Sequence, residues 1–301
     1  MSTRSARWFL LLCSIAGGCG DDGQGQPCRD DSECESGFCR ADGTCAPAED
    51  VDAGPAIDAP PEDGTVALCV PNHDGNVALD ELPHEPGKMA TFRVATNATF
   101  ATAGTSTGNG MRRWDLTAAL SNDTDRALTL MSPTGTWWAS SFPTATYAAV
   151  LSADSDLLGV FRASTSSLEL LGVVSPNAGS TRTELEYDPP AKILSLPVTA
   201  GGTWTSTSTV SGVALGAIVA YTEKYESLVD QVGTMKTPYG EFPVLRTATD
   251  LTRTSGFATL LTTRSFAWVS ECFGSIANVR SRDFESSSEF DDPAEVRRLA
   301  P

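Results

Sequence analysis

The chain has 301 residues, with 38 Asp and Glu against 21 Lys and Arg, and its formal net charge is −17. This acidity excludes a general nucleic-acid binder, because phosphate binding needs clustered positive charge. Two His leave little material for a histidine-rich zinc site. Residues 19–68 hold nine Asp and four Glu against two Arg, a net charge of −11, so the acidity is concentrated before the main body of the chain.

Residues 1–18 have the pattern of a secretory signal peptide. Arg4 and Arg7 make the start basic, and the apolar run WFLLLCSI follows at 8–15. Eight residues are far fewer than the roughly 20 that a membrane-spanning helix requires. A basic start, a short apolar run and small residues therefore predict an exported protein.

The small residues after the apolar run end at a cysteine, in the order Ile15-Ala16-Gly17-Gly18-Cys19. This segment resembles the lipobox of bacterial lipoproteins, although Ala16 stands where that family usually has Leu. The resemblance implies that residues 19–27 form a lipidated N-terminus, with acyl chains such as palmitate on Cys19 anchoring the protein in a membrane. Gly20, rather than Asp, follows the cysteine and favours the outer membrane of the cell envelope over retention at the inner membrane. The alternative is ordinary signal cleavage, which leaves Cys19 unmodified.

Residues 28–45 contain four cysteines in the spacing C-x5-C-x4-C-x5-C. In an exported chain this density predicts a small disulfide-stabilised module, whereas a zinc site would favour C-x2-C pairs. Four cysteines allow three connectivities, and our hypothesis is Cys28 with Cys39 and Cys34 with Cys45. The segment resembles small Cys-rich modules near the N-termini of extracytoplasmic lipoproteins of high-GC bacteria.

Residues 46–66 are rich in Pro, Ala, Asp and Gly and contain no aromatic residue. Such a segment cannot bury enough apolar surface to offset its ordering entropy. We therefore expect a disordered, extended acidic linker that holds the rest of the protein away from the membrane.

Residues 89–283 are predicted to form an all-β domain, mainly of antiparallel sheet, as a sandwich or a curved half-barrel. There are 31 Thr between Thr91 and Thr263, and turn signals such as Gly108-Asn109-Gly110 recur about every 8–14 residues. Alternation of polar and apolar residues is clear in Trp204–Val210. Residues 284–301 are expected to form a flexible polar tail.

The segment Thr234–Arg246 contains the pattern T-P-x-G-x-F-x-x-x-R. It is similar to a hairpin in bacterial periplasmic proteins with a curved half-barrel sheet, related in shape to lipoprotein carriers. The resemblance covers about 80 residues, and it implies a concave apolar surface able to hold a lipid or another apolar ligand. The alternative is that the aromatic residues fill the core of a closed sheet.

Cys69 and Cys272 lie at the two ends of the predicted β domain. In an oxidising compartment two remaining cysteines usually pair, so we predict a Cys69–Cys272 disulfide. Such a bridge closes a loop of about 200 residues, which in the loop-entropy description removes much of the freedom of the unfolded chain.

Residues 67–88 form an entrance segment that resembles a calcium-binding loop. Gly75 falls on the glycine position of an EF-hand loop, and oxygen-bearing side chains fall on ligand positions around it. These candidate Ca²⁺ ligands are Asn72, Asp74, Asn76 and Glu81. Val70 stands where the first Asp belongs and Pro71 follows it, so we expect weak Ca²⁺ binding at most and no other cofactor; the alternative is a turn without a metal.

The sequence has no H-E-x-x-H or P-loop pattern. The letters G-x-G-x-x-G occur at 18–23 and G-x-S-x-G at 104–108, but neither stands between a predicted strand and a predicted helix, as the catalytic or cofactor-binding form of each motif requires. We therefore predict no enzyme activity and no catalytic residues. The first hypothesis is an envelope-anchored lipoprotein that displays a β-rich interaction domain to an unknown protein. The second is a half-barrel carrier of an apolar ligand, and the third is a hydrolase with an unrecognised site.

Overall fold

The computed structural model describes residues 28, 29, 31–33, 39, 44 and 69–301. The chain divides into two compact units, Met1–Ala67 and Leu68–Pro301, and each is described separately. The predicted signal peptide, lipidation residue Cys19 and acidic linker lie outside the described residues. So do Cys34 and Cys45.

In the first unit, the described residues include a disulfide between Cys28 and Cys39. A short 3₁₀ turn, η1 (Asp31–Glu33), lies within this loop, and the Glu33 carboxylate accepts a hydrogen bond of 2.7 Å from the Arg29 amide. One of the two expected bridges of the module is therefore present, while its partner falls outside the described residues.

The second unit is built from strands, with one short 3₁₀ turn, η3 (Leu79–Glu81). The strands are β1 (Asn76–Val77), β2 (Met89–Thr96), β3 (Thr105–Gly108), β4 (Met111–Asp115), β5 (Thr124–Thr129), β6 (Tyr147–Val150), β7 (Leu158–Ala163), β8 (Ser167–Val174), β9 (Glu184–Ser195), β10 (Val198–Thr199), β11 (Thr203–Ala214), β12 (Ala217–Lys236), β13 (Glu241–Ser255), β14 (Ala258–Ser270), β15 (Gly274–Arg280) and β16 (Glu295–Ala300). The all-β prediction is confirmed.

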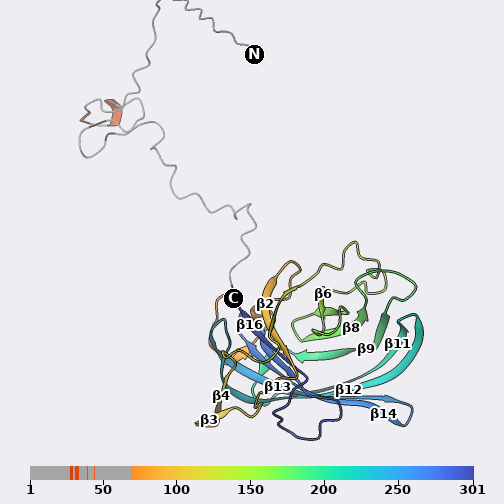
Figure 1. Ribbon diagram of the computed structural model, residues 1–301. Coiled ribbons are helices and arrows are strands. Elements are labelled where there is room, and N and C mark those ends of the chain that lie inside the picture. Colours follow the sequence, from red (N-terminus) through yellow and green to blue (C-terminus); the bar gives the residue numbers. More distant parts are fainter. Residues whose placement is uncertain (1–27, 30, 34–38, 40–43, 45–68) are drawn as a thin grey trace, which may run out of the picture. The chain divides into compact units, whose positions relative to one another are not determined.

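Most strands belong to one antiparallel sheet in the order β5-β2-β16-β15-β14-β13-β12-β11-β9-β8-β7-β6. Strand β4 adds to β12 in parallel and carries β3. A single bridge between Met131 and Ala148 links the two ends of this order, just beyond β5 and within β6. The sheet is therefore nearly closed and barrel-like, and Figure 1 shows it curling so that β6–β9 lie across from β12–β14.

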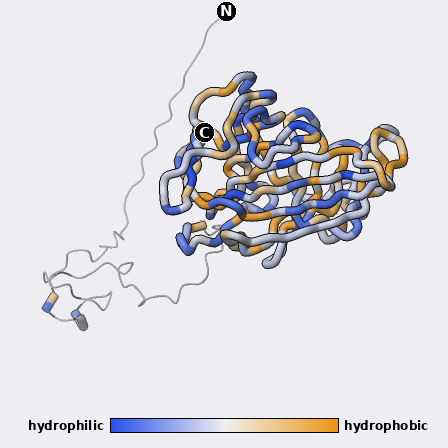
Figure 2. Tube along the Cα trace, turned by 90° about the horizontal axis from the view of Figure 1, so that it is seen from below, coloured by the Kyte–Doolittle hydropathy of each residue, from blue (hydrophilic) through white to orange (hydrophobic). Residues whose placement is uncertain are grey.

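The alternating sequence of β11 explains why this segment forms a strand. Trp204, Ser208 and Val210 are buried, whereas most of the Thr residues between them face outward. Because successive side chains of a strand point to opposite faces, this pattern places Trp204, Ser208 and Val210 inside and a row of Thr outside. Figure 2 shows the same interleaving of hydrophobic and hydrophilic positions across the long strands.

The predicted hairpin at Thr234–Arg246 is present as the turn between β12 and β13. Thr234 pairs with Pro243, and the Thr237 amide donates to the Gly240 carbonyl oxygen at 2.8 Å. In β12, Gly233 lies directly against β4, where an added Cβ atom would fall 1.8 Å from the Arg112 carbonyl oxygen. Glycine is therefore required for the parallel pairing of β4.

The prediction of a flexible tail at 284–301 is wrong for its second half. Residues 295–300 form β16, which lies inside the sheet between β15 and β2. The physical reason is that Arg298 is fully buried and paired: it binds the Asp123 carboxylate at 2.7 Å and donates to the Leu116 carbonyl oxygen at 2.9 Å. The β domain consequently extends beyond 283 and includes this strand.

Aromatic residues build the largest core, where Trp114, Trp268 and Phe266 pack with apolar side chains of β2, β13, β15 and β16. The rings of Trp114 and Trp268 meet edge to face with centroids 5.5 Å apart. A second core surrounds Trp204 and Leu245, and it receives Val77 of the entrance segment. Side chains of the sheet therefore form two hydrophobic cores, and the second core also holds residues of the entrance segment, which precedes β2.

A disulfide joins Cys69 to Cys272 across 203 residues, as the sequence predicts. We expect the double substitution Cys69→Ser with Cys272→Ser to lower the free energy of unfolding by up to about 5 kcal/mol, because the unfolded chain regains the entropy of that loop. Chemical denaturation of the oxidised full-length protein measures this change.

The matched control is the pair Cys28→Ser with Cys39→Ser, which should leave the unfolding of Leu68–Pro301 unchanged because its bridge closes only a short loop in the other unit. An equal loss in both double variants would contradict a specific role for the longer bridge.

Candidate functional site

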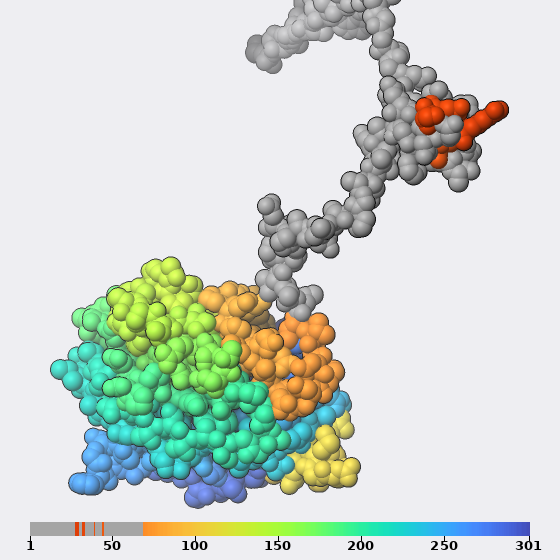
Figure 3. Space-filling view, turned by 180° about the vertical axis from the view of Figure 1, so that it is seen from behind, coloured from red at the N-terminus to blue at the C-terminus, as the bar shows by residue number. Residues whose placement is uncertain are grey.

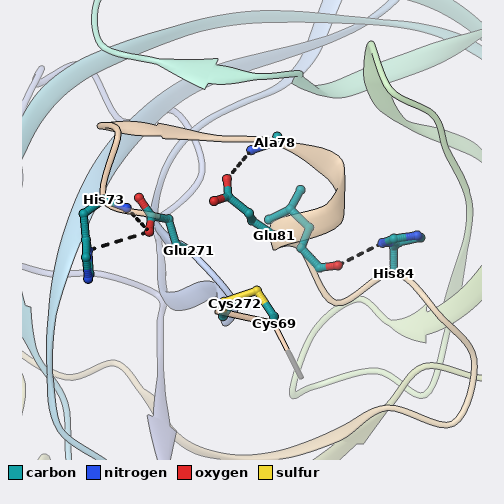
Figure 4. Close-up of a disulfide and its surroundings, with 8 residues drawn as sticks. Cys69, His73, Ala78, Glu81, His84, Glu271 and Cys272 are labelled. Carbon is teal, nitrogen blue, oxygen red and sulfur yellow. Dashed lines mark hydrogen bonds and ion pairs between the residues drawn. A yellow bond between two sulfur atoms is a disulfide. The ribbon is translucent and has the colours of Figure 1, made fainter. Parts of the chain in front are cut away.

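The entrance segment is fastened to the end of β14 by a group of contacts that we call the clasp: Cys69, His73, Glu81, Glu271 and Cys272. Beside the disulfide, the Cys272 amide donates to the Glu81 carbonyl oxygen at 2.8 Å. The His73 amide donates to the Glu271 carboxylate at 3.0 Å, and the His73 ring nitrogen Nδ1 lies 3.7 Å from the same oxygen. Figure 4 shows these residues converging around the disulfide.

Apolar packing and a small sheet complete the attachment of this segment. Strand β1 pairs with β10 in antiparallel register, Asn76 with Thr199 and Val77 with Val198. Leu79 and Leu82 pack against the core around Trp204. Residues 69–88 are therefore an integral part of the second unit.

The candidate calcium ligands divide into two groups. The Asn72 side-chain oxygen accepts a hydrogen bond from the Asp74 amide at 2.8 Å, and the Asp74 carboxylate accepts one from the Asn76 amide at 2.7 Å. These are Asx turns, in which the side chain stabilises the backbone two residues further on.

Glu81 lies on η3 and is buried. One of its carboxylate oxygens accepts from the Ala78 amide at 2.9 Å, and the other is buried without a hydrogen-bond partner among the described residues. Within 69–301 and the few described positions before it, no three His, Cys, Asp or Glu side chains gather in the manner of a metal site. The structure places Glu81 in the clasp rather than in a loop of converging oxygens.

We expect Ca²⁺ at millimolar concentration to leave the melting temperature of the full-length protein unchanged, because the oxygens of Asn72 and Asp74 already accept backbone hydrogen bonds. Isothermal titration calorimetry and thermal melts measure this. A saturable heat that is abolished by Glu81→Gln, but retained in Glu85→Gln, would contradict it and restore the calcium hypothesis.

A groove of about 610 Å³ lies across β11–β14. Two rows of residues, paired from strand to strand across β11–β14, form its floor. The first row is Thr203, Leu228, Ala248 and Phe266, and the second is Thr205, Glu226, Asp250 and Arg264. Its lining residues are Thr203, Trp204, Thr205, Glu226, Ser227, Leu228, Asp230, Ala248, Asp250, Arg264, Phe266 and Ser288.

Charged side chains line this groove, and most of them are already engaged. Arg264 holds the Asp250 carboxylate with two hydrogen bonds of 2.6 and 2.7 Å and donates to the Ser287 carbonyl oxygen. The hydrogen bond with Asp250 raises the pKa of the Arg264 guanidinium. Trp204 and Phe266 are nearly completely buried, so they offer little aromatic surface to a ligand in the groove.

Arg246 lies at the centre of a buried ion network. Its guanidinium binds the Asp230 carboxylate at 2.6 and 3.0 Å and the Glu289 carboxylate at 2.6 and 3.1 Å, and it donates to the Thr102 carbonyl oxygen at 2.7 Å. It also lies 4.2 Å from the centre of the Phe266 ring. Burial alone would lower the pKa of Arg246, but the hydrogen bonds to Asp230 and Glu289 outweigh it and the pKa is raised.

A second polar cluster surrounds Glu223, whose side chain is almost completely buried. Arg253 binds its carboxylate at 2.8 Å, and the Tyr225 hydroxyl donates to it. Burial is the main cause that raises the pKa of Tyr187, and the negative charge of Glu223 adds to it. Burial is also the main cause that raises the pKa of Tyr225, and the neighbouring Tyr187 adds to it. The protonated Tyr225 hydroxyl is the donor in its hydrogen bond to Glu223.

The sequence does not predict the Arg246 network. Arg246 ends the T-P-x-G-x-F-x-x-x-R pattern, which is the signal that singles it out, but nothing in that pattern indicates its partners. Asp230 and Glu289 lie 16 and 43 residues away in sequence and reach Arg246 only through the register of the sheet and the loop after β15. The histidines take no part in either network: His73 faces Glu271, and the His84 ring lies 2.9 Å from the Leu82 carbonyl oxygen.

Comparison with known proteins gives little family information. No protein-family model matches the chain, and no curated protein matches it. Among solved structures, the chain is similar to one named a putative lipoprotein from Parabacteroides distasonis, with 10% identity, a TM-score of 0.32, and coverage of 72% of this chain and 95% of that one. Among the described residues, none of the helical segments has the length and apolar character that crossing a membrane would require.

We expect Arg246→Ala to lower the free energy of unfolding by about 3–5 kcal/mol, because two carboxylates then remain beside the core without their cation. Denaturant unfolding of the full-length protein measures this loss. Arg93→Ala is the control: the Arg93–Asp125 pair has the same kind of contact, at 2.8 Å, but is exposed to solvent, and its removal should leave the unfolding midpoint nearly unchanged. Similar losses in both variants would contradict a special role for the buried network.

Proposed function

We propose that this protein is an envelope-anchored lipoprotein that displays its β domain as an interaction domain for a protein partner. The observation that carries the proposal is the order of basic start, apolar run and small residues ending at Cys19. Acyl chains on this cysteine would hold the chain at a membrane, since each buried methylene contributes about 0.8 kcal/mol. By analogy with lipoproteins of enteric bacteria, in which Asp after the cysteine signals retention at the inner membrane, Gly20 mildly favours the outer membrane.

The two stable bridges support an extracytoplasmic location. Cys28–Cys39 and Cys69–Cys272 are disulfides, and such bonds persist in oxidising compartments outside the cytosol. The acidic segment 46–66 would separate the β domain from the membrane anchor, because its charges repel one another.

The properties of the groove favour display over carriage of an apolar ligand and over catalysis. Its carboxylates Asp230 and Asp250 are bound by Arg246 and Arg264, so they have the character of structural ion pairs rather than of a free acid or base. A carrier would favour an apolar lining, whereas this groove carries four ionisable side chains: Glu226, Asp230, Asp250 and Arg264. We therefore propose an interaction role without enzyme activity.

We expect Cys19→Ala to abolish incorporation of a palmitate analogue and to release the protein from the membrane fraction, because the acylated thiol is removed. Metabolic labelling in a bacterial host followed by cell fractionation measures both effects. Cys13→Ala is the control, since Cys13 follows Leu12 rather than a small residue and should retain the label. Labelling that persists in Cys19→Ala and disappears in Cys13→Ala would contradict the proposed anchor.

A further inference from the structure

Two neighbouring hairpins end in exposed apolar tips. We define the tips as residues 214–218, between β11 and β12, and residues 255–260, between β13 and β14. Leu215 is 80% exposed and Ile218 is 89% exposed, while Phe257 is completely exposed and Leu260 is half-exposed. Large apolar side chains exposed together in this way mark a contact with a partner or a membrane.

The register of the sheet brings both tips to the same end of the domain. Thr222 of β12 pairs with Thr254 of β13, and from that pair both strands run on to their own tips. The first tip therefore projects about four residues, or roughly 13 Å, further than the second along the strand direction. Figure 3 shows two separate projections at the left edge of the molecule, one turquoise and one blue.

Neither tip contains a charged residue. No Asp, Glu, Lys or Arg occurs in 213–221 or in 254–263, although 20% of the whole chain is charged. A charged side chain is costly to move into a bilayer, whereas Leu, Ile and Phe are favourable there. The polar residues of the two stretches are Ser, Thr and Tyr, besides Gly.

The backbone of both tips is paired almost to its end. Ala214 pairs with Ala217, and Ser255 pairs with Ala258, so two residues of the first tip lie outside the ladder. In the second tip, Gly256 and Phe257 lie outside it, and a register shift leaves Leu260 unpaired as well. Each tight turn contains a glycine in the left-handed backbone conformation, Gly216 with a φ of 83° and Gly256 with a φ of 57°. Unpaired backbone groups are the main cost of placing a non-helical segment in lipid, and this geometry keeps them few.

We infer that the two tips dock on a lipid bilayer by inserting Leu215, Ile218 and Phe257 at the boundary between headgroups and acyl chains. A rigid protein partner would need a surface matched to two projections at different heights, whereas a fluid bilayer adapts to both. The inference draws on the proposed function in one respect, because the anchor at Cys19 keeps a bilayer within reach.

The tether is long enough for this contact. The clasp lies at Cys272, beyond Ser270 at the far end of β14 from its tip, so the chain enters the domain at the opposite end. Strand β14 has 13 residues and spans roughly 43 Å. The 23 residues at 46–68, if fully extended, span up to roughly 80 Å, which exceeds that length.

The test uses the full-length protein reconstituted into phosphatidylcholine vesicles that contain a phospholipid with a photoreactive diazirine in its acyl chain. We expect peptides covering 213–221 and 254–263 to carry cross-linked lipid after irradiation and mass mapping. The double variant Ile218→Asp with Phe257→Asp should lose at least nine-tenths of these cross-links. Both side chains face solvent, so the fold should be retained, and an unchanged thermal melt checks this.

The matched control is Val70→Asp with Met89→Asp, which adds the same charge at two exposed apolar positions away from the tips and should retain the cross-links. Phosphatidylcholine vesicles carry no net charge, so the added Asp residues are neither attracted nor repelled by the charge of the membrane surface. Cross-links confined to the N-terminal peptide, or an equal loss in both double variants, would overturn the inference. Concentration-dependent self-association that disappears in the tip variant, without cross-links at the tips, would assign the tips to a second copy and also overturn it.

The proposed function is tested separately in the same sample. The mass of the peptide that begins at Cys19 reports acylation whether or not the tips are cross-linked. A failed anchor and a failed tip contact therefore give different results.

Discussion

The continuous antiparallel ladder from β11 to β14 is the constraint on which the other features depend. Strand β12 pairs with β11 and β13 along most of its 20 residues and takes up β4 at its end. Because these strands follow one another through short turns, the chain forms the ladder at a small cost in loop closure. The ladder then places the groove on its surface, Arg246 in its centre, the tips at one end and the clasp at the other.

Local signals in the sequence predict part of this ladder. Alternating Thr and apolar residues predict β11, and the T-P-x-G pattern predicts the hairpin between β12 and β13. The pairing of Cys69 with Cys272 was predictable because these two cysteines remain once Cys13 is assigned to the signal peptide, Cys19 to the segment that resembles a lipobox and four cysteines to the N-terminal module. In contrast, the sequence predicts a flexible tail where β16 forms, since this polar segment carries Arg297 and Arg298 and charged side chains usually face solvent. Its burial depends on Asp123, 175 residues earlier.

The candidate site was less predictable because it, like β16, depends on contacts between residues that are far apart in the sequence. Glu81 has the spacing of a calcium ligand, but its position in the structure is set by Cys272, which contacts it from the other end of the chain. Asp230 reaches Arg246 because the ladder shifts register between Val229 and Gln231. A β-bulge of this kind redirects a side chain without a clear mark in the sequence. Contacts between distant segments thus determine which ionisable groups meet.

The position of β16 also fixes the order in which the molecule can assemble. Thr96 of β2 pairs with Glu295 of β16, so two segments separated by almost 200 residues must meet before β2 gains its second neighbour. Long-range pairing of this kind forms slowly, because the loop between the strands must close first. A chain that leaves the cytosol as an extended polypeptide therefore completes its sheet only after β16 has crossed. In the export that we propose, the fold itself would therefore keep the sheet open while β16 is still in the cytosol.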